Sequence, residues 1–186
     1  MNTIKNNYES SYVIKKSKFI SFIIKVDNKM QAKEIISEMK NKYKDASHVC
    51  YAYKIGTLEK ASDDKEPVHT ASYPILNVIK NNNLNNVIII VARYFGGIKL
   101  GASNLSRAYK KAAEDVVLED NIIEDKIYKK AKIEFLYDNI KQIDYILKDY
   151  EIIEKNFNQN VIYLFLYEEN NYPKKLDNLI KEKTLH

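Results

Sequence analysis

The alternation of apolar and polar residues predicts a β-hairpin followed by an amphipathic helix at the start of the chain. Apolar residues at 12–14 and 19–24 flank the cluster Lys15-Lys16-Ser17-Lys18, a pattern typical of two strands joined by a turn. Asn28 is positioned to cap the helix that follows, because its side-chain oxygen can accept hydrogen bonds from the first free amides. The helical period is carried by Met30, Ile35, Ile36, Met39 and Tyr43.

The apolar run Val87–Val91 predicts a strand that is buried on both faces, and all five of its residues are β-branched. Residues 47–56 alternate in polarity and predict a further strand. A polar loop at 61–72 leads into a short helix that ends at about Asn81. A second helix, ending at about Glu119, is expected after the Val87–Val91 strand.

The pattern restarts beyond Asp125. The expected elements are strands at 127–137, 150–157 and 161–167, a helix capped by Asp138, and a last helix at 173–183. Strand, helix, strand, strand, helix is a ferredoxin-like arrangement without its closing strand. We therefore expect an α+β protein with two domains, residues 1–125 and 126–186, the second lacking its last strand.

Composition narrows the class of protein. The formal net charge of +5 is compatible with a nucleic-acid or ribosome partner but is far from that of a polybasic tail. The single cysteine, Cys50, excludes an intramolecular disulfide and fits a reducing compartment. The sequence has no apolar run approaching a membrane span and no apolar leader, so we expect a cytoplasmic protein without a membrane partner.

Backbone freedom and positive charge are concentrated in the segment after the Val87–Val91 strand. It holds three of the chain's four glycines and both arginines: Gly96, Gly97, Gly101, Arg93 and Arg107. Lys99 lies in the turn, and Ser103 or Asn104 can cap the helix that follows. Free amides at a helix N-terminus favour an anion. The alternative is that each arginine forms an internal ion pair with the acidic loop at residues 63–66.

Three pieces of sequence carry a resemblance to a known family. They are His48–Tyr53 (HVCYAY), Ser62–Pro67 (SDDKEP) with Thr70-Ala71 and Pro74–Leu76, and Arg93–Gly97 (RYFGG) with Leu100-Gly101 and Arg107–Tyr109. In that order and spacing they resemble the IMPACT/YigZ family, as a short member of the bacterial type. The resemblance covers roughly residues 10–120, and the remainder is more loosely similar to the family's ferredoxin-like C-terminal domain.

The resemblance implies a fold and a broad role. The first domain would be an α/β domain of the type shared by a small-ribosomal-subunit protein and domain IV of elongation factor G, and the second would be similar to domain V of that factor. For short members the implied function is translation-linked or nucleic-acid binding, without an established reaction. The eukaryotic members' restraint of an amino-acid-starvation kinase uses an extra N-terminal domain and is not carried over.

The chain also departs from the family pattern. Lys65, His69 and Ser72 stand where the family usually has glycine, as do Ser103-Asn104 after Gly101. These changes weaken the idea that both loops need bare backbone against a ligand. The sequence also ends where the family would continue into a last strand.

Two groups of residues suggest a metal site. Asp63, Asp64 and Glu66 are candidates for a Mg²⁺ site that would hydrolyse a phosphorylated or peptide substrate beside the arginines. The alternative is an acidic loop that neutralises a basic turn without any ligand. His48 and Cys50, with a second histidine along the chain, invite a zinc site, but zinc needs four ligands at recognisable spacing.

We expect a non-enzymatic RNA- or ribosome-binding protein linked to translation or its regulation, with no resident metal or cofactor. The alternatives are the metal-assisted hydrolase and a protein-interaction module. Aromatic rings in the turn would stack on unpaired bases. The sequence sets no oligomeric state. The expected contact residues are Arg93, Tyr94, Phe95, Gly96, Gly97, Lys99, Gly101 and Arg107.

Overall fold

The fold was analysed in a computed structural model that describes residues 1–126 and 128–185. The chain divides into two units, Met1–Asp125 and Lys126–His186. Within the described residues it is a mixed α/β protein with four α-helices and several sheets. Each unit has its own apolar core, so each is treated separately.

The centre of unit 1 is a five-stranded antiparallel sheet in the order β2-β3-β6-β4-β5. Its strands are β2 (Tyr8–Ile14), β3 (Ser17–Lys25), β4 (His48–Ile55), β5 (Leu58–Ser62) and β6 (Val87–Tyr94). The central strand, β6, is buried from Val87 through Arg93, which confirms the prediction from its run of β-branched residues. The expected hairpin is β2 and β3.

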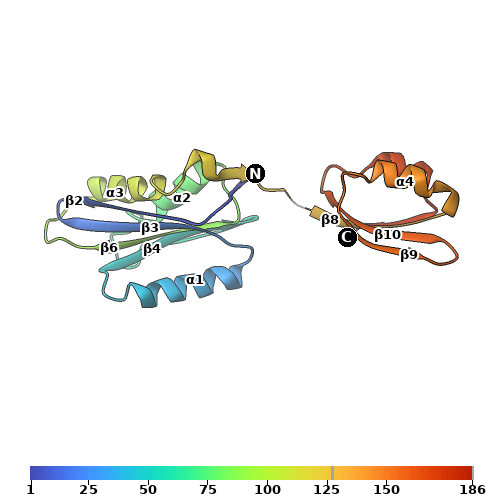
Figure 1. The fold of residues 1–186 in the computed structure, drawn as a ribbon. Helices are drawn as coiled ribbons and strands as arrows, with labels where there is room; N and C mark the ends of the chain where they lie inside the picture. Colours follow the sequence, from blue (N-terminus) through green and yellow to red (C-terminus); the bar gives the residue numbers. More distant parts are fainter. Residues whose placement is uncertain (127, 186) are drawn as a thin grey trace. The chain divides into compact units, whose positions relative to one another are not determined.

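Helices cover both faces of this sheet (Figure 1). Helix α1 (Lys29–Lys42) lies on one face, and α2 (Ser72–Asn81) and α3 (Ala102–Glu114) lie on the other. Successive side chains of β6 point to opposite faces of the sheet, which explains the two cores. Ile88 and Ile90 pack in the core on the α1 side, while Ile89 and Val91 pack in the core beneath α2 and α3. The two-sided burial fixes the register of β6.

Unit 1 contains elements that the pattern did not predict. Strand β5 is an edge strand of largely exposed residues, and β1 (Asn2–Ile4) pairs with β7 (Ile122–Glu124) after a short 3₁₀ turn, η1 (Glu119–Asn121). Such short or exposed strands are not revealed by a regular alternation of apolar and polar residues in the sequence. Helix α3 ends at Glu114 instead of about Glu119, where the chain turns toward β7.

Unit 2 is a four-stranded antiparallel sheet in the order β11-β8-β10-β9. Helix α4 covers one face of it (Figure 1). The elements are β8 (Tyr128–Phe135), η2 (Tyr137–Asn139), α4 (Ile140–Ile146), β9 (Ile152–Phe157), β10 (Val161–Glu168), η3 (Lys174–Asn178) and β11 (Glu182–Leu185). The cap position of α4 is Asn139, the last residue of the 3₁₀ turn η2, instead of Asp138.

The end of the chain differs from the prediction of a last helix at 173–183 and a missing closing strand. A 3₁₀ helix follows Pro173, and β11 then pairs with β8, from Glu182 opposite Glu134 to Leu185 opposite Ala131. All four residues of β11 are exposed, so the strand shows no apolar alternation. Backbone pairing, which the side-chain pattern does not reveal, holds it and covers that edge of β8.

The cap of α1 gives a first testable prediction. Asn28 Oδ1 accepts hydrogen bonds from the amides of Met30 and Gln31, each at 3.0 Å. Replacing Asn28 with Ala leaves those donors without a side-chain acceptor, so we expect a loss of about 1 kcal/mol in the free energy of unfolding. Chemical denaturation measures it, with Lys29→Ala on the same turn as the control. An equal loss in both variants would show that the cap contributes nothing specific.

Candidate functional site

A hollow of about 480 Å³ lies in unit 1 where the three sequence pieces meet. The first piece supplies His48, the second Glu66 and Pro67, and the third Arg93, Phe95, Leu100 and Gly101. Lys99 and the first turn of α3 complete the lining. Segments that are far apart in the sequence therefore form one cavity.

Strand pairing explains why these residues meet. His48 at the start of β4 lies opposite Arg93 near the end of β6. The loop after β5 returns to the same end of the sheet, where the amide of Val49 donates to Asp64 Oδ2 at 2.7 Å. The cap position of helix α3 is Gly101, whose φ of 79° lies in the left-handed region that favours glycine.

A buried ion pair joins the loop to the sheet. Arg93 Nη1 donates to Glu66 Oε1 at 2.6 Å, and the Tyr109 hydroxyl donates to the same oxygen at 2.7 Å. The side chains of Arg93 and Glu66 are only 6% and 4% exposed. The guanidinium carbon lies 5.5 Å from the ring centroids of both Phe19 and Phe95.

This ion pair corrects the expected role of Arg93. A buried guanidinium that is neutralised by Glu66 is not an exposed phosphate contact, so the alternative of an internal pair holds for this arginine. It does not hold for Arg107, which is exposed on α3 and makes no ion pair within residues 1–126 and 128–185. The two arginines therefore differ in role.

His48 borders the same carboxylate. Its Nδ1 lies 2.9 Å from the carbonyl oxygen of Asp64, and its Nε2 lies 3.7 Å from Glu66 Oε2. A carbonyl oxygen only accepts, so Nδ1 carries the proton and Nε2 faces the carboxylate. This arrangement fixes the orientation of the ring in the hollow.

Cys50 lies behind the ion pair and is chemically inert there. Its S–H donates to the carbonyl oxygen of Asp63 at 3.0 Å, and its Sγ lies 3.4 Å from the Tyr109 hydroxyl oxygen. Burial raises the pKa of the thiol to about 12, so it is protonated at neutral pH and is not a nucleophile. Burial also raises the pKa of Tyr109.

The carboxylates of the acidic loop are occupied by protein donors. Asp63 accepts from the amides of His69, Ala71 and Ser72 and from the Ser72 hydroxyl, at 2.7–3.0 Å. Asp64 accepts from the amide of Val49 and from Lys40 Nζ, each at 2.7 Å. Among the residues that the structure describes, no group of three or more His, Cys, Asp or Glu is placed to hold a metal ion. The magnesium and zinc interpretations therefore lose their geometric basis.

The turn after β6 packs on the hairpin tip. A Cβ at Gly96 would lie 2.1 Å from the carbonyl carbon and oxygen of Lys16, so only glycine fits. The hairpin lysines Lys15, Lys16 and Lys18 are consequently neighbours of this turn, and all three are exposed. The sequence analysis placed these lysines only in a turn. Their clustered positive charge was the signal that could have indicated a part in the site.

The remaining predicted residues lie at or near the same turn. Gly97 and Lys99 are exposed, and Phe95 is 46% exposed. The Tyr94 hydroxyl donates to Asp45 at 3.0 Å, so this residue has a partner within the protein. Neither Ser103 nor Asn104 caps α3, because the helix begins at Ala102 and both residues lie inside it. The cap position is Gly101, which has no side chain to form a cap.

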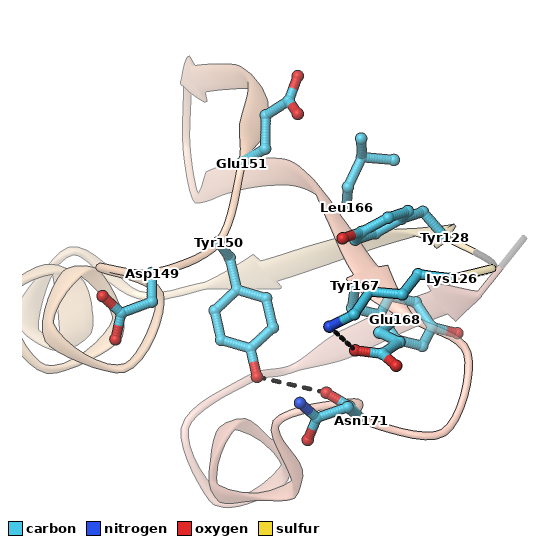
Figure 2. A pocket seen from close by; sticks show the side chains of 9 residues that line it. All are labelled: Lys126, Tyr128, Asp149, Tyr150, Glu151, Leu166, Tyr167, Glu168 and Asn171. Atoms are coloured by element: carbon cyan, nitrogen blue, oxygen red, sulfur yellow. Dashed lines mark hydrogen bonds and ion pairs between the residues drawn. The ribbon is translucent and has the colours of Figure 1, made fainter. Parts of the chain in front are cut away.

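Unit 2 has a hollow of its own, of about 500 Å³, shown in Figure 2. Tyr150 donates to the carbonyl of Asn171 at 3.3 Å, and Lys126 pairs with Glu168 at 3.2 Å. None of the site residues predicted from the sequence lines it. The candidate site is therefore the hollow of unit 1.

Comparison with known proteins decides the family. The Impact N-terminal domain family matches residues 15–117, which contain the whole lining of the unit 1 hollow. The chain belongs to the IMPACT family. The resemblance drawn from the three sequence pieces is thus confirmed.

Relatives extend the IMPACT match beyond that domain. The chain is 35% identical over 172 residues to the IMPACT family member YvyE of Bacillus subtilis (strain 168), covering 90% of this chain and 79% of YvyE. An IMPACT family member of Haemophilus influenzae is 28% identical over 158 residues, covering 80% and 75%. A crystal structure of a hypothetical protein aligns with a TM-score of 0.70 at 23% identity, over 99% of this chain and 95% of that one, which shows the fold alone.

No helix among the described residues of this IMPACT-family chain is long and apolar enough to cross a membrane.

Removing the acidic partner of the buried pair tests its structural role. Glu66→Leu leaves Arg93 charged and uncompensated, so we expect a loss of about 3–5 kcal/mol in the free energy of unfolding. The double variant Glu66→Leu/Arg93→Met removes both charges and should recover most of that loss in denaturant titrations. Glu59→Ala, which breaks an exposed pair with Lys80, is the control and should cost about 0–1 kcal/mol. A double variant no more stable than Glu66→Leu contradicts the assignment.

The acidic loop predicts a dependence of stability on pH. Burial acts to raise the pKa of Asp63, but hydrogen bonds from Ser72, His69 and Ala71 outweigh it and hold this pKa below its ordinary value. A carboxyl group with a lowered folded-state pKa contributes stability that is present above about pH 4 and is lost as the pH falls through the folded value.

Asp63→Asn should therefore reduce the decrease in unfolding free energy between pH 6 and acidic pH. The wild-type protein and Asp27→Asn, an exposed aspartate, should show the full decrease. Denaturant titrations across that pH range provide the measurement. If the unfolding free energy of Asp63→Asn decreases toward acidic pH as much as that of the wild type, Asp63 is not a source of the pH dependence.

Proposed function

We propose that this IMPACT-family protein is a non-enzymatic, cytoplasmic RNA-binding protein, free or on the ribosome, that is linked to translation or its regulation. Its contact surface would be the basic end of unit 1, defined here as Lys15, Lys16, Lys18, Lys99 and Arg107 with the ring of Phe95. This surface replaces the one expected from the sequence, because Arg93 is buried. Family membership supports the translation-linked part of the proposal.

The observation that carries the proposal is the unpaired charge of this end. All five cations are exposed, and the described part of the chain offers none of them an ion-pair partner. Lys40, Lys80 and Lys111 pair with Asp64, Glu59 and Asp115, whereas Lys25, Lys33 and Lys60 are also exposed without an ion pair among the described residues. What sets this end apart is that several such cations lie around one turn, where Gly96 packs on Lys16 and Lys18 pairs with Tyr94. Exposed unpaired cations attract a polyanion, because each phosphate contact releases a condensed counterion.

Phe95 adds a second property of nucleic-acid surfaces. Its ring is 46% exposed beside the cations, and the buried Arg93 guanidinium lies 5.5 Å from its centroid. An exposed ring offers a face on which an unpaired base can stack, at about 1–3 kcal/mol per base. This combination favours single-stranded RNA over a duplex.

We also propose finer assignments for the two units. Strand order β11-β8-β10-β9 with the chain order strand, helix, strand, strand, 3₁₀ helix, strand supports a ferredoxin-like unit 2, in which η3 stands in place of the second helix. The family resemblance supports relating unit 1 to domain IV of elongation factor G and to a small-ribosomal-subunit protein. The boundary at Asp125 is proposed as the domain boundary.

A protein-interaction module is the second candidate, favoured by one observation. Val13, Phe95 and Ile98, near the turn that packs on the hairpin tip, are 65%, 46% and 41% exposed. Clustered exposed apolar side chains are typical of partner surfaces. A protein partner held by this patch would bind with little dependence on salt, which separates the two candidates.

Filter-binding titrations of a single-stranded RNA at two salt concentrations test the proposal. We expect affinity to fall steeply with salt, and Lys16→Ala and Lys99→Ala each to reduce the log–log slope by about 0.7 for a single-stranded ligand. Lys33→Ala is the matched control, because this exposed lysine belongs to α1 on the opposite face of the sheet. Binding that ignores salt, or that all three substitutions leave unchanged, rejects the basic end as the RNA surface.

A further inference from the structure

Two hydrogen-bond acceptors face each other in the unit 1 hollow. His48 Nδ1 donates to the carbonyl of Asp64, so in the neutral ring Nε2 presents a lone pair. Glu66 Oε2 lies 3.7 Å away. Glu66 Oε1 takes the donors from Arg93 and Tyr109, whereas Oε2 receives no hydrogen bond within residues 1–126 and 128–185.

This acceptor pair is a built feature of the site. The Glu66 side chain is only 4% exposed, and its position is fixed by two hydrogen bonds. Oε2 is not among the fully buried atoms without a partner, and Glu66 lines the hollow, so this oxygen is accessible to a ligand there. A ligand with two adjacent donors fits the pair, one donor for each acceptor.

Another part of the lining of the hollow is suited to an anion. Lys99 lines it, together with Gly101 and Ala102 at the start of the 13-residue helix α3. No side chain caps this helix, and the positive end of its dipole adds to the lysine charge. Arg93 also lines the hollow, and its buried Nε has no hydrogen-bond partner in the described structure.

We propose that the hollow binds a terminal ribonucleotide unit through its free vicinal diol. The 2′- and 3′-hydroxyls would donate to His48 Nε2 and Glu66 Oε2, and the 5′-phosphate would lie toward Lys99 and the start of α3. The base would stack on Phe95 at the rim. A volume of about 480 Å³ is within the range of small-molecule sites.

The same chemistry occurs in a free 5′-ribonucleotide and at the 3′ end of an RNA. The proposal rests on the RNA-binding function of the basic end and adds to it, because the hollow would select strands that end in an intact ribose. A deoxy end leaves one or both acceptors without a donor, which is the physical basis of the selection.

The test compares 5′-fluorescein-labelled RNAs of one sequence by fluorescence anisotropy. Their last residue carries a normal ribose, a 2′-deoxyribose, a 3′-deoxyribose or a 2′,3′-dideoxyribose, so their charge is the same. We expect each deletion to weaken binding several-fold and the dideoxy end to weaken it about tenfold or more. Calorimetric titration with 5′-AMP and its 2′,3′-dideoxy analogue separates the free nucleotide from the RNA end.

A variant links the effect to the site. His48→Ala should lose the discrimination against the 2′-deoxy end, whose acceptor it lacks, and keep that against the 3′-deoxy end, which Glu66 Oε2 still reads, with the salt dependence of the wild-type protein retained. Thermal denaturation checks that it folds. If it does not fold, the ligand series on the wild-type protein still decides the proposal.

The outcomes of the ligand series are distinguishable. Equal binding of all four RNAs with steep salt dependence overturns the diol site and leaves the RNA-binding function standing. Binding of 5′-AMP that needs the diol, without any binding of RNA, supports the hollow and overturns the RNA-binding function. The absence of binding by every probe overturns both.

Discussion

The buried ion pair between Arg93 and Glu66 is the interaction on which the arrangement of unit 1 depends. It fixes the loop after β5 against the end of the central strand, and the Tyr109 hydroxyl fixes α3 to the same carboxylate. The loop, the central strand and α3 are therefore joined at one atom, Glu66 Oε1. Because two charges out of water are tolerated only with good geometry and additional hydrogen bonds, this arrangement has little freedom to rearrange. The hollow owes its shape to that constraint.

The buried pair also affects how charge is distributed over the surface of unit 1. The loop carboxylates of Asp63 and Asp64 receive backbone amides, a hydroxyl and one lysine, and Glu66 receives the arginine, so this acidic segment is neutralised within the protein. Among the residues that the structure describes, the lysines at the hairpin tip and in the turn after β6 have no such counterpart. A chain with a modest net charge of +5 thereby presents one end with locally unbalanced positive charge.

Sequence reasoning succeeded where burial leaves a strong pattern. The run Val87–Val91 and the cap at Asn28 were predicted correctly, because two-sided burial and a side-chain cap are both visible in the residue types. Strand β11 was not predictable in the same way, since exposed residues held by backbone pairing carry no period. For the site, proximity of the acidic loop and the basic turn was expected, but the separate roles of Arg93 and Arg107 were not. Their difference arises from the cross-strand position of Arg93 opposite His48, which depends on register.

The contact between Gly96 and the backbone of Lys16 has a mechanical consequence. With no room for even a methyl group between them, any side chain at position 96 would force the hairpin tip and the end of the central strand apart. Such a substitution would therefore disturb the position of the hairpin lysines beside the turn that carries Phe95 and Lys99.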